Sequence, residues 1–404
     1  MELMTHNNPN RAPIAIPDEA FLARRVALSR ALAAQEVDAW LAYGDDGACA
    51  GPSHIRYLLD LEPHFEPIAV LRRADGKELV LTGPETLGYE LTVRRPGTER
   101  VVAAEFLGHA SEEYPTIEVV NGAAEIATFL SGIKRLGLIG CERMPQSFYR
   151  EIAGAISDQG RDVIAVDDIA FALRAIKSRD EQAVIDEAYR IAKAGLLAAA
   201  AAIKPGVSER YVAAEAEAAM RREGAEGFGI DTMVASGVIN TQPIIARSSH
   251  RIIQRDDLIS VTVAPRYEGY HAALARPFLM QANPEIEKYV MVAREAQLRC
   301  AEALKVGALG FDAEKLAREV VAAGNTGSHF PYVGVHSIGA VEFEPPIFAS
   351  HSNDVIHEGM ALSIDIPLFH ASWGGFRIED GFSITGGQAQ PRLADYQNIV
   401  PLLL

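Results

Sequence analysis

The sequence predicts an N-terminal α/β domain followed by a second domain of the α+β class, and three observations lead to this prediction. The chain has 404 residues, of which 49% are hydrophobic, so it is long enough for two domains with separate cores. In its first part, short β-rich runs alternate with stretches of helical spacing. After about residue 169, Ala- and Glu-rich helical stretches are grouped apart from runs typical of antiparallel strands.

The α/β domain is expected over residues 19–168, after a polar N-terminal arm at residues 1–18 that lacks a hydrophobic segment of signal-peptide length. The stretch EAFLARRVALSRALAAQ has the spacing of an amphipathic helix. Strands are predicted at five hydrophobic runs, namely AWLAY, IAVLRR, ELVLTG, RLGLIG and DVIAV.

The second domain is expected over residues 169–404. Ser178 is followed three residues later by Glu181, which is the pattern of a capping box, so a long helix is predicted to begin there. Further helices are predicted at residues 208–223 and 284–306. Strands are predicted in DTMVASG, in a hairpin within DDLISVTVAPRYEGYHAALARP, in ALSIDIPLFH and in FRIEDGFSIT.

Composition limits the classes of partner. With 38 basic and 54 acidic residues, the net charge is −16, which repels phosphate backbones, so no nucleic acid is expected to bind. No segment approaches the length of a membrane span, so no membrane partner is expected. The three cysteines, Cys49, Cys141 and Cys300, predict neither a disulfide framework nor a cysteine zinc site, and a cytoplasmic location is expected.

Several motifs occur in the order that they have in one known family. They are SHIRYL, LRAIKSRDE, ASGVINTQP, GYHAALAR, HSIGAVEFEPP, GMALSIDIP and GGFRIEDGFSIT. Together they resemble the creatinase, aminopeptidase P and prolidase family over nearly the whole chain. The resemblance implies that residues 169–404 form a catalytic domain with the pita-bread fold, after a creatinase-like N-terminal domain.

The same resemblance implies where metal ligands would lie. In metal-dependent members, two acids from the hairpin, one His and two acids from the last strands suit a pair of divalent ions. The matching positions here are Thr262 and Ala273 in the hairpin, and then His336, Asp365 and Glu379. A hydroxyl and a methyl group cannot offset the charge of two clustered cations, so no dinuclear metal site is expected.

Creatinase resembles these peptidases in fold but hydrolyses a small C–N bond without a metal. Its catalytic His falls on Ile244 or Ile245 of this sequence, depending on a one-residue gap, and its Glu falls on Ala275. Residue matching therefore does not support creatinase activity itself.

Four residues are predicted to form a metal-free acid–base cluster, namely His336, His271, Asp365 and Glu379. If its strand is regular, His271 shares one face with Ala273. A histidine transfers protons near neutral pH, and a carboxylate can orient its ring. The alternatives are that His271 is a polar residue satisfied by a neighbour and that Asp365 forms a structural ion pair with Arg377.

Four further residues are predicted to bind substrate. Arg377 matches a family position that contacts substrate, and its guanidinium suits a carboxylate. Phe343 replaces a family His and adds an apolar wall, while Glu344 keeps the acid of that motif. Arg247, in the stretch RSSHR, is expected at most to anchor the substrate.

These residues predict a cytoplasmic, metal-independent hydrolase without a cofactor. It would be creatinase-like and cleave an amide or amidine C–N bond of a small, carboxylated metabolite. A homodimer is expected, although the loop PHFEP, which could reach a partner's pocket, is more simply a surface loop. Two alternatives remain open. One is an Xaa-Pro dipeptidase-like peptidase or lyase with one divalent metal ion at His336, Asp365 and Glu379. The other is a non-catalytic binding homologue.

Overall fold

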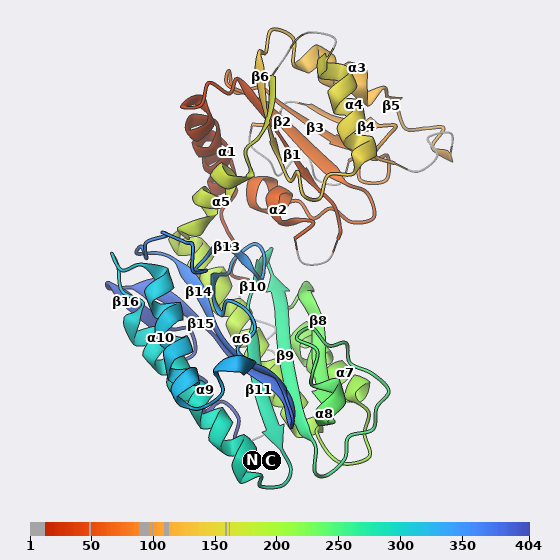
Figure 1. Ribbon diagram of the computed structural model, residues 1–404. Coiled ribbons are helices and arrows are strands. Elements are labelled where there is room, and N and C mark those ends of the chain that lie inside the picture. Colours follow the sequence, from red (N-terminus) through yellow and green to blue (C-terminus); the bar gives the residue numbers. More distant parts are fainter. Residues whose placement is uncertain are drawn as a thin grey trace. The chain divides into compact units, whose positions relative to one another are not determined.

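The protein folds as two compact units, which are described separately. The structure, a computed structural model, describes residues 13–47, 50–88, 97–98, 100–108, 113–157, 160 and 162–404 (Figure 1). One unit is Ile16–Arg174, and the other is built mainly from Ala175–Leu404. The domain limits drawn from the sequence stay a prediction, and most of the expected N-terminal arm lies outside the described residues.

The first unit contains a mixed seven-stranded sheet in the order β5-β4-β3-β2-β1-β6-β7. Its strands are β1 (Ala39–Gly44), β2 (Ile68–Arg73), β3 (Glu78–Thr82), β4 (Arg100–Ala104), β5 (Val119–Val120), β6 (Arg135–Ile139) and β7 (Asp162–Ala165). Its helices are α1 (Asp18–Ala33), α2 (Ser53–Leu59), α3 (Gly122–Phe129), α4 (Gln146–Ser157) and α5 (Asp167–Ala175). The central strand β1 is buried along its whole length, as its unbroken apolar run predicts. The predicted α/β class is confirmed.

The second unit contains an antiparallel nine-stranded sheet. Its main path is β10-β9-β11-β15-β14-β12-β13, and β8 pairs with β9 while β16 pairs with β15. The strands are β8 (Gly227–Ser236), β9 (Leu258–Tyr267), β10 (Tyr270–His271), β11 (Leu274–Leu279), β12 (Val335–Ser337), β13 (Glu344–Ile347), β14 (Ala361–Ala371), β15 (Gly374–Thr385) and β16 (Gln388–Pro391). The helices are α6 (Arg179–Ala202), α7 (Glu209–Arg222), α8 (Gly237–Asn240), α9 (Pro284–Ala303) and α10 (Gly310–Ala323).

Helix boundaries follow local signals in the sequence. Ser178 Oγ accepts a hydrogen bond from the backbone N–H of Glu181, and the Glu181 carboxylate accepts one from the backbone N–H of Ser178. The predicted capping box is therefore confirmed. Helix α10, which the sequence analysis did not predict, follows Leu309, a residue that has no side-chain capping group.

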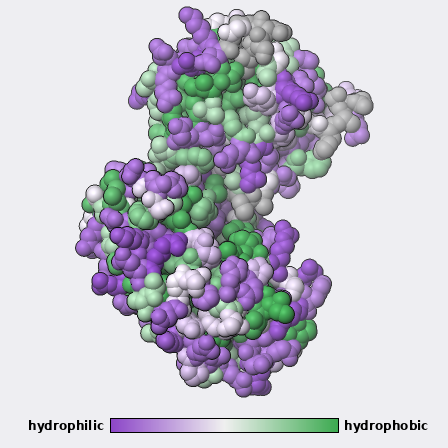
Figure 2. Space-filling model, in the orientation of Figure 1, coloured by the Kyte–Doolittle hydropathy of each residue, from purple (hydrophilic) through white to green (hydrophobic). Residues whose placement is uncertain are grey.

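The helices pack along different parts of the sheet. Helix α6 contacts β9, β10 and β11, while α9 contacts β14 and β15 and lies beside α10 (Figure 1). Hydrophilic side chains cover most of the face seen in Figure 2. Among the described residues, no helix is both long enough and apolar enough to cross a membrane.

A buried ion pair joins β11 to β15. Arg276 donates hydrogen bonds from Nη1 to the carbonyl oxygens of Ala275 at 2.8 Å and Glu379 at 3.0 Å, and from Nη2 to Asp380 Oδ1 at 2.7 Å. Gln297 of α9 donates to the second oxygen of Asp380 at 3.0 Å. The pair thus fixes the central strands to each other and to a covering helix.

Arg276→Met is expected to destabilise the second unit by about 3–5 kcal/mol, because it leaves the buried carboxylate of Asp380 without its counter-ion. The measurement is urea unfolding followed by Trp373 fluorescence in a Trp40→Phe background. Arg299→Met, which removes an exposed ion pair on α9, is the control and should cost less than about 1 kcal/mol. Equal losses in the two variants would contradict the bracing role of Arg276.

Candidate active site

Three buried side chains converge at the centre of the second sheet. His336 of β12, Glu379 of β15 and Glu342 of the β12–β13 turn each offer one ligand atom, and these atoms lie within 4.8 Å of one another. All three residues are buried. We call them the His–Glu–Glu group. Its side chains are an imidazole and two carboxylates, which are common ligands of divalent transition metals.

His336 is poised as a neutral acceptor. Its Nδ1 lies 3.0 Å from the carbonyl oxygen of Ser337, which assigns the ring proton to Nδ1 and leaves a lone pair on Nε2. Burial lowers the pKa of His336 to about 4, so the ring is uncharged at neutral pH. The ring of Phe343, which is 43% exposed, lies with its centroid 4.3 Å from that of His336 and covers it.

Ionisation of the two carboxylates in the group is energetically unfavourable. Glu379 Oε1 accepts a hydrogen bond from Ser363 Oγ at 2.8 Å, whereas the buried Oε2 has no hydrogen-bond partner among the described residues. Burial, reinforced by the charges of Asp365 and Glu342, raises the pKa of Glu379 well above its usual range. Burial also raises the pKa of Glu342 to about 7. Such a site would be stabilised by a cation.

Asp365 lies next to the His–Glu–Glu group without belonging to it. It faces Glu379 directly across the β14–β15 pair. Its Oδ2 accepts a hydrogen bond from the Tyr332 hydroxyl and lies 3.5 Å from Arg377 Nη1, while its Oδ1 has no partner among the described residues. Among the described residues, Glu342 and not Asp365 completes a group of three possible metal ligands with His336 and Glu379. The alternative ion pair with Arg377 is present.

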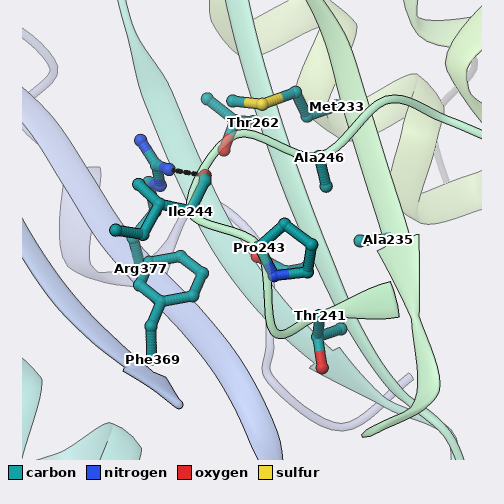
Figure 3. Close-up of a pocket in the computed structure, with 10 residues that line it drawn as sticks. Met233, Ala235, Thr241, Pro243, Ile244, Ala246, Thr262, Phe369 and Arg377 are labelled. Carbon is teal, nitrogen blue, oxygen red and sulfur yellow. Dashed lines mark hydrogen bonds between the residues drawn. The ribbon is translucent and has the colours of Figure 1, made fainter. Parts of the chain in front are cut away.

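Arg377 is a buried cation at the edge of this cluster. Besides its contact with Asp365, its Nη2 donates to the carbonyl oxygen of Ile244 (Figure 3). The guanidinium lies over the rings of Phe369 and Tyr332, at 5.4 and 5.6 Å from their centroids. Burial alone would lower the pKa of Arg377, but Tyr332 and the nearby carboxylates raise it, so the charge is permanent.

A small pocket that is partly open to solvent lies beside Arg377. Figure 3 shows the loop that carries Pro243 and Ile244 on one side of it and Phe369 on another. Arg377 is the single charged side chain among the described residues that line it: Met233, Ala235, Thr241, Pro243, Ile244, Ala246, Ser260, Thr262, Phe369 and Arg377. The pocket suits an apolar group next to a carboxylate or carbonyl oxygen.

The pocket loop is held by a buried carboxylate that the sequence analysis missed. Glu209 accepts hydrogen bonds from the backbone and hydroxyl groups of Ser236, at 2.7 Å each, and from those of Ser249, at 3.0 and 2.6 Å. Asn240 donates to both of its oxygens. Glu209 thus ties the end of β8 to the loop that follows α8.

The hairpin contributes no carboxylate. Ala275 lies between Thr262 of β9 and Glu379 of β15, so these three positions form one row across the sheet. Ala273 and Ala275 are fully buried and Thr262 nearly so. The two hairpin positions that hold acids in metal-dependent relatives are thus a methyl group and a hydroxyl group packed inside the sheet.

His271 is not one of the three residues of the His–Glu–Glu group. The register against β9 continues from the pair His271–Arg266 to the pair Leu274–Val263, so the alternation expected from the sequence is kept, but His271 lies four residues before Ala275, the residue opposite Glu379. His271 Nδ1 lies 3.1 Å from the Gly339 carbonyl oxygen, and its ring fills the space beside Gly229, where a Cβ atom would lie 2.4 Å from it. Burial lowers its pKa to about 4, and the nearby charge of Arg266 adds to this effect.

Two residues expected to bind substrate lie elsewhere. Glu344 forms an ion pair with Lys177 Nζ at 3.2 Å, and Lys177 also donates a hydrogen bond to Ser337 Oγ at 2.8 Å. Glu344 is therefore part of a buried structural contact. The side chain of Arg247 is 88% exposed and lies 3.7 Å from Asp231, outside the pocket lining. A substrate-anchoring role for Arg247 stays a prediction.

Comparison with known proteins identifies the family. Residues 183–386 match metallopeptidase family M24. The chain is also 30% identical to the Xaa-Pro dipeptidase of Pyrococcus horikoshii over 320 residues, which cover 78% of this chain and 90% of that protein. The chain belongs to metallopeptidase family M24.

Solved structures of other M24 proteins support this assignment and the predicted pita-bread fold. The Xaa-Pro dipeptidase from Bacillus anthracis has a TM-score of 0.78 and 25% sequence identity, with 92% of this chain and 97% of that chain covered. The prolidase from Pyrococcus horikoshii OT3 has a TM-score of 0.76 at the same identity and coverage. The resemblance to the creatinase, aminopeptidase P and prolidase family is therefore confirmed.

Family membership corrects the predicted chemistry. A metal-independent, creatinase-like hydrolase without a cofactor was expected, because Thr262 and Ala273 replace two acids. That expectation is contradicted by the match to a metallopeptidase family, by the similarity to Xaa-Pro dipeptidases and by the His–Glu–Glu group. The prediction was based on the two absent hairpin acids and did not consider Glu342, a carboxylate outside the family's five ligand positions.

Glu342→Gln is expected to lower the affinity for Zn²⁺ or Mn²⁺ by at least about 10-fold, because an amide replaces an anionic ligand. The measurement is competition with a metal-binding dye on protein freed of metal. Glu344→Gln is the matched control, two residues away in the chain, and should disturb the contact with Lys177 and leave the metal affinity nearly unchanged. Equal losses of affinity in the two variants would rule out Glu342 as a ligand.

Proposed function

We propose that this M24 protein uses one divalent metal ion to hydrolyse the amide bond of a short peptide of the Xaa-Pro dipeptide class. The observation that carries the proposal is the His–Glu–Glu group, in which three ligand atoms lie within 4.8 Å of one another and Glu379 Oε2 lacks a hydrogen-bond partner among the described residues. The substrate class follows from relatives that are named Xaa-Pro dipeptidases.

The residues present fit one ion. His336, Glu342 and Glu379 would hold it, and a three-ligand set leaves a coordination position for water or substrate. When bound, a divalent ion supplies Lewis acidity and lowers the pKa of a water molecule. A second ion has no comparable support, since Thr262 and Ala273 offer no carboxylate.

The remaining side chains would bind and orient the peptide. Arg377 lines the pocket and uses two of its five N–H donors in the contacts with Asp365 and Ile244, so its fork can also hold a substrate carboxylate or carbonyl oxygen. Phe369 and Ile244 give the pocket apolar walls. The ring of Phe343 covers the ring of His336.

Removal of metal with a chelator is expected to abolish hydrolysis of Xaa-Pro dipeptides, and about one equivalent of Zn²⁺, Mn²⁺ or Co²⁺ should restore it. His336→Ala should lower kcat/KM by at least about 10²-fold, because the ion loses a ligand. Metal analysis and dipeptide hydrolysis are measured on the same samples. His351→Ala, which removes an exposed His, is the control and should behave as the unchanged protein.

Full activity with less than about 0.1 ion per chain would reject the metal-dependent proposal. A protein that binds one ion but hydrolyses no amide would favour the second candidate, a binding homologue. That candidate is suggested by the hairpin, where Thr262 and Ala273 replace acids that metal-dependent relatives use.

We also propose that the protein is a homodimer with two-fold symmetry in the cytoplasm. In the loop PHFEP, Phe65 has a positive φ of 66°, and its side chain is 56% exposed. Its backbone N–H donates a hydrogen bond to Asp46 Oδ2 at 3.2 Å. Light scattering at micromolar concentration should give twice the mass of one chain, and Phe65→Ser should weaken the association. A monomer would contradict the proposal.

A further inference from the structure

The buried charges around the site do not balance. Glu342, Asp365 and Glu379 are buried acids, and Arg377 is the buried base that interacts with all three. His336 is neutral because burial lowers its pKa. With every carboxylate ionised, three negative charges and one positive charge leave a net charge of −2. One divalent ion would neutralise this cluster, and a second would leave it with a net charge of +2.

We infer that the positive charge of Arg377 offsets part of the negative charge of the site and thereby limits it to one divalent ion. Asp365, in this inference, positions Arg377 and is not a metal ligand. The inference rests on the proposed metal-dependent function. It assigns to the arginine a role in the affinity and number of bound ions that is separate from any contact with substrate.

The contacts of Asp365 support its assignment. Its Oδ2 accepts a hydrogen bond from the Tyr332 hydroxyl and lies 3.5 Å from Arg377 Nη1, and Asp365 is not one of the three residues of the His–Glu–Glu group. Its Oδ1 has no hydrogen-bond partner among the described residues. Pro367 is the residue opposite Arg377 across the β14–β15 pair, so Asp365 reaches the guanidinium diagonally along the sheet.

Arg377 is also held from the other side. Its Nη2 donates to the Ile244 carbonyl oxygen in the pocket loop, and Phe369 packs against its face. A guanidinium cannot lose its proton under these conditions, so the positive charge is fixed at one end of the cluster. Any cation that enters the His–Glu–Glu group is repelled by this charge and attracted by three carboxylates.

A charge cycle tests the inference through metal affinity alone. Arg377→Met changes the net charge of the cluster from −2 to −3 and should tighten Zn²⁺ or Mn²⁺ binding by about 10-fold or more. Asp365→Asn changes it to −1 and should weaken binding by a similar factor. The double variant Asp365→Asn, Arg377→Met restores −2, so its affinity should return close to that of the unchanged protein.

The experiment is titration calorimetry on the full chain, with near-ultraviolet circular dichroism as a check on folding. If Arg377→Met alone does not fold, the comparison of Asp365→Asn with the double variant gives the same test. Recovery of affinity in the double variant supports a charge role. The inference is overturned if the double variant does not regain metal affinity, or if a folded Arg377→Met protein binds metal more weakly. Either result would mean that these residues affect metal binding by positioning other groups and not by their charge.

The number of bound ions is a second readout. The unchanged protein should bind one ion, and Thr262→Asp with Ala273→Asp should bind a second ion more tightly when Arg377→Met is added. No gain from Arg377→Met in that background overturns the inference. Absence of peptide hydrolysis would reject the proposed function but leave the charge cycle intact, so the two failures are distinguishable.

Discussion

The burial of three carboxylates at the centre of one sheet is the constraint on which the second unit depends. Glu342, Asp365 and Glu379 are all removed from water. Besides burial, the charge of Asp365 raises the cost of ionising Glu342, and the charges of Asp365 and Glu342 raise the cost of ionising Glu379. Glu379 accepts a hydrogen bond from Ser363, and Asp365 accepts one from the Tyr332 hydroxyl. The second oxygen of each carboxylate lacks a partner among the described residues. A cation is the most direct way to compensate such a cluster.

The sheet separates the charges that stabilise the fold from those that carry the chemistry. Side chains alternate along β15, so Arg377 and Glu379 share one face while Asp380 takes the other. On that second face, Asp380 forms an ion pair with Arg276 and accepts a hydrogen bond from Gln297 of α9. On the first face, Glu379 Oε2 has no hydrogen-bond partner among the described residues. One strand therefore serves packing and function without competition between its charged groups.

The sequence predicted most of the scaffold and part of the site. The predicted strand FRIEDGFSIT is part of β15, and the capping box at Ser178 located the start of α6. Glu342 could not be found in this way, because it lies in an irregular turn where no periodicity indicates a side-chain direction. His271 lies four residues before Ala275, the residue opposite Glu379, and its ring contacts the Gly339 carbonyl oxygen. Helix α10 lacks a side-chain cap and gave no start signal.

The hairpin shows that this fold does not require carboxylates at positions 262 and 273. Thr262, Ala273 and Ala275 are buried, and the β9–β11 pairing beside them continues through apolar residues such as Val263 and Leu274. A methyl group there packs without a metal, so the sheet does not need two ions to hold its strands together. The M24 fold can therefore persist while its ligand set changes, and the activity must be inferred from the side chains that remain. In this chain those side chains are His336, Glu342 and Glu379.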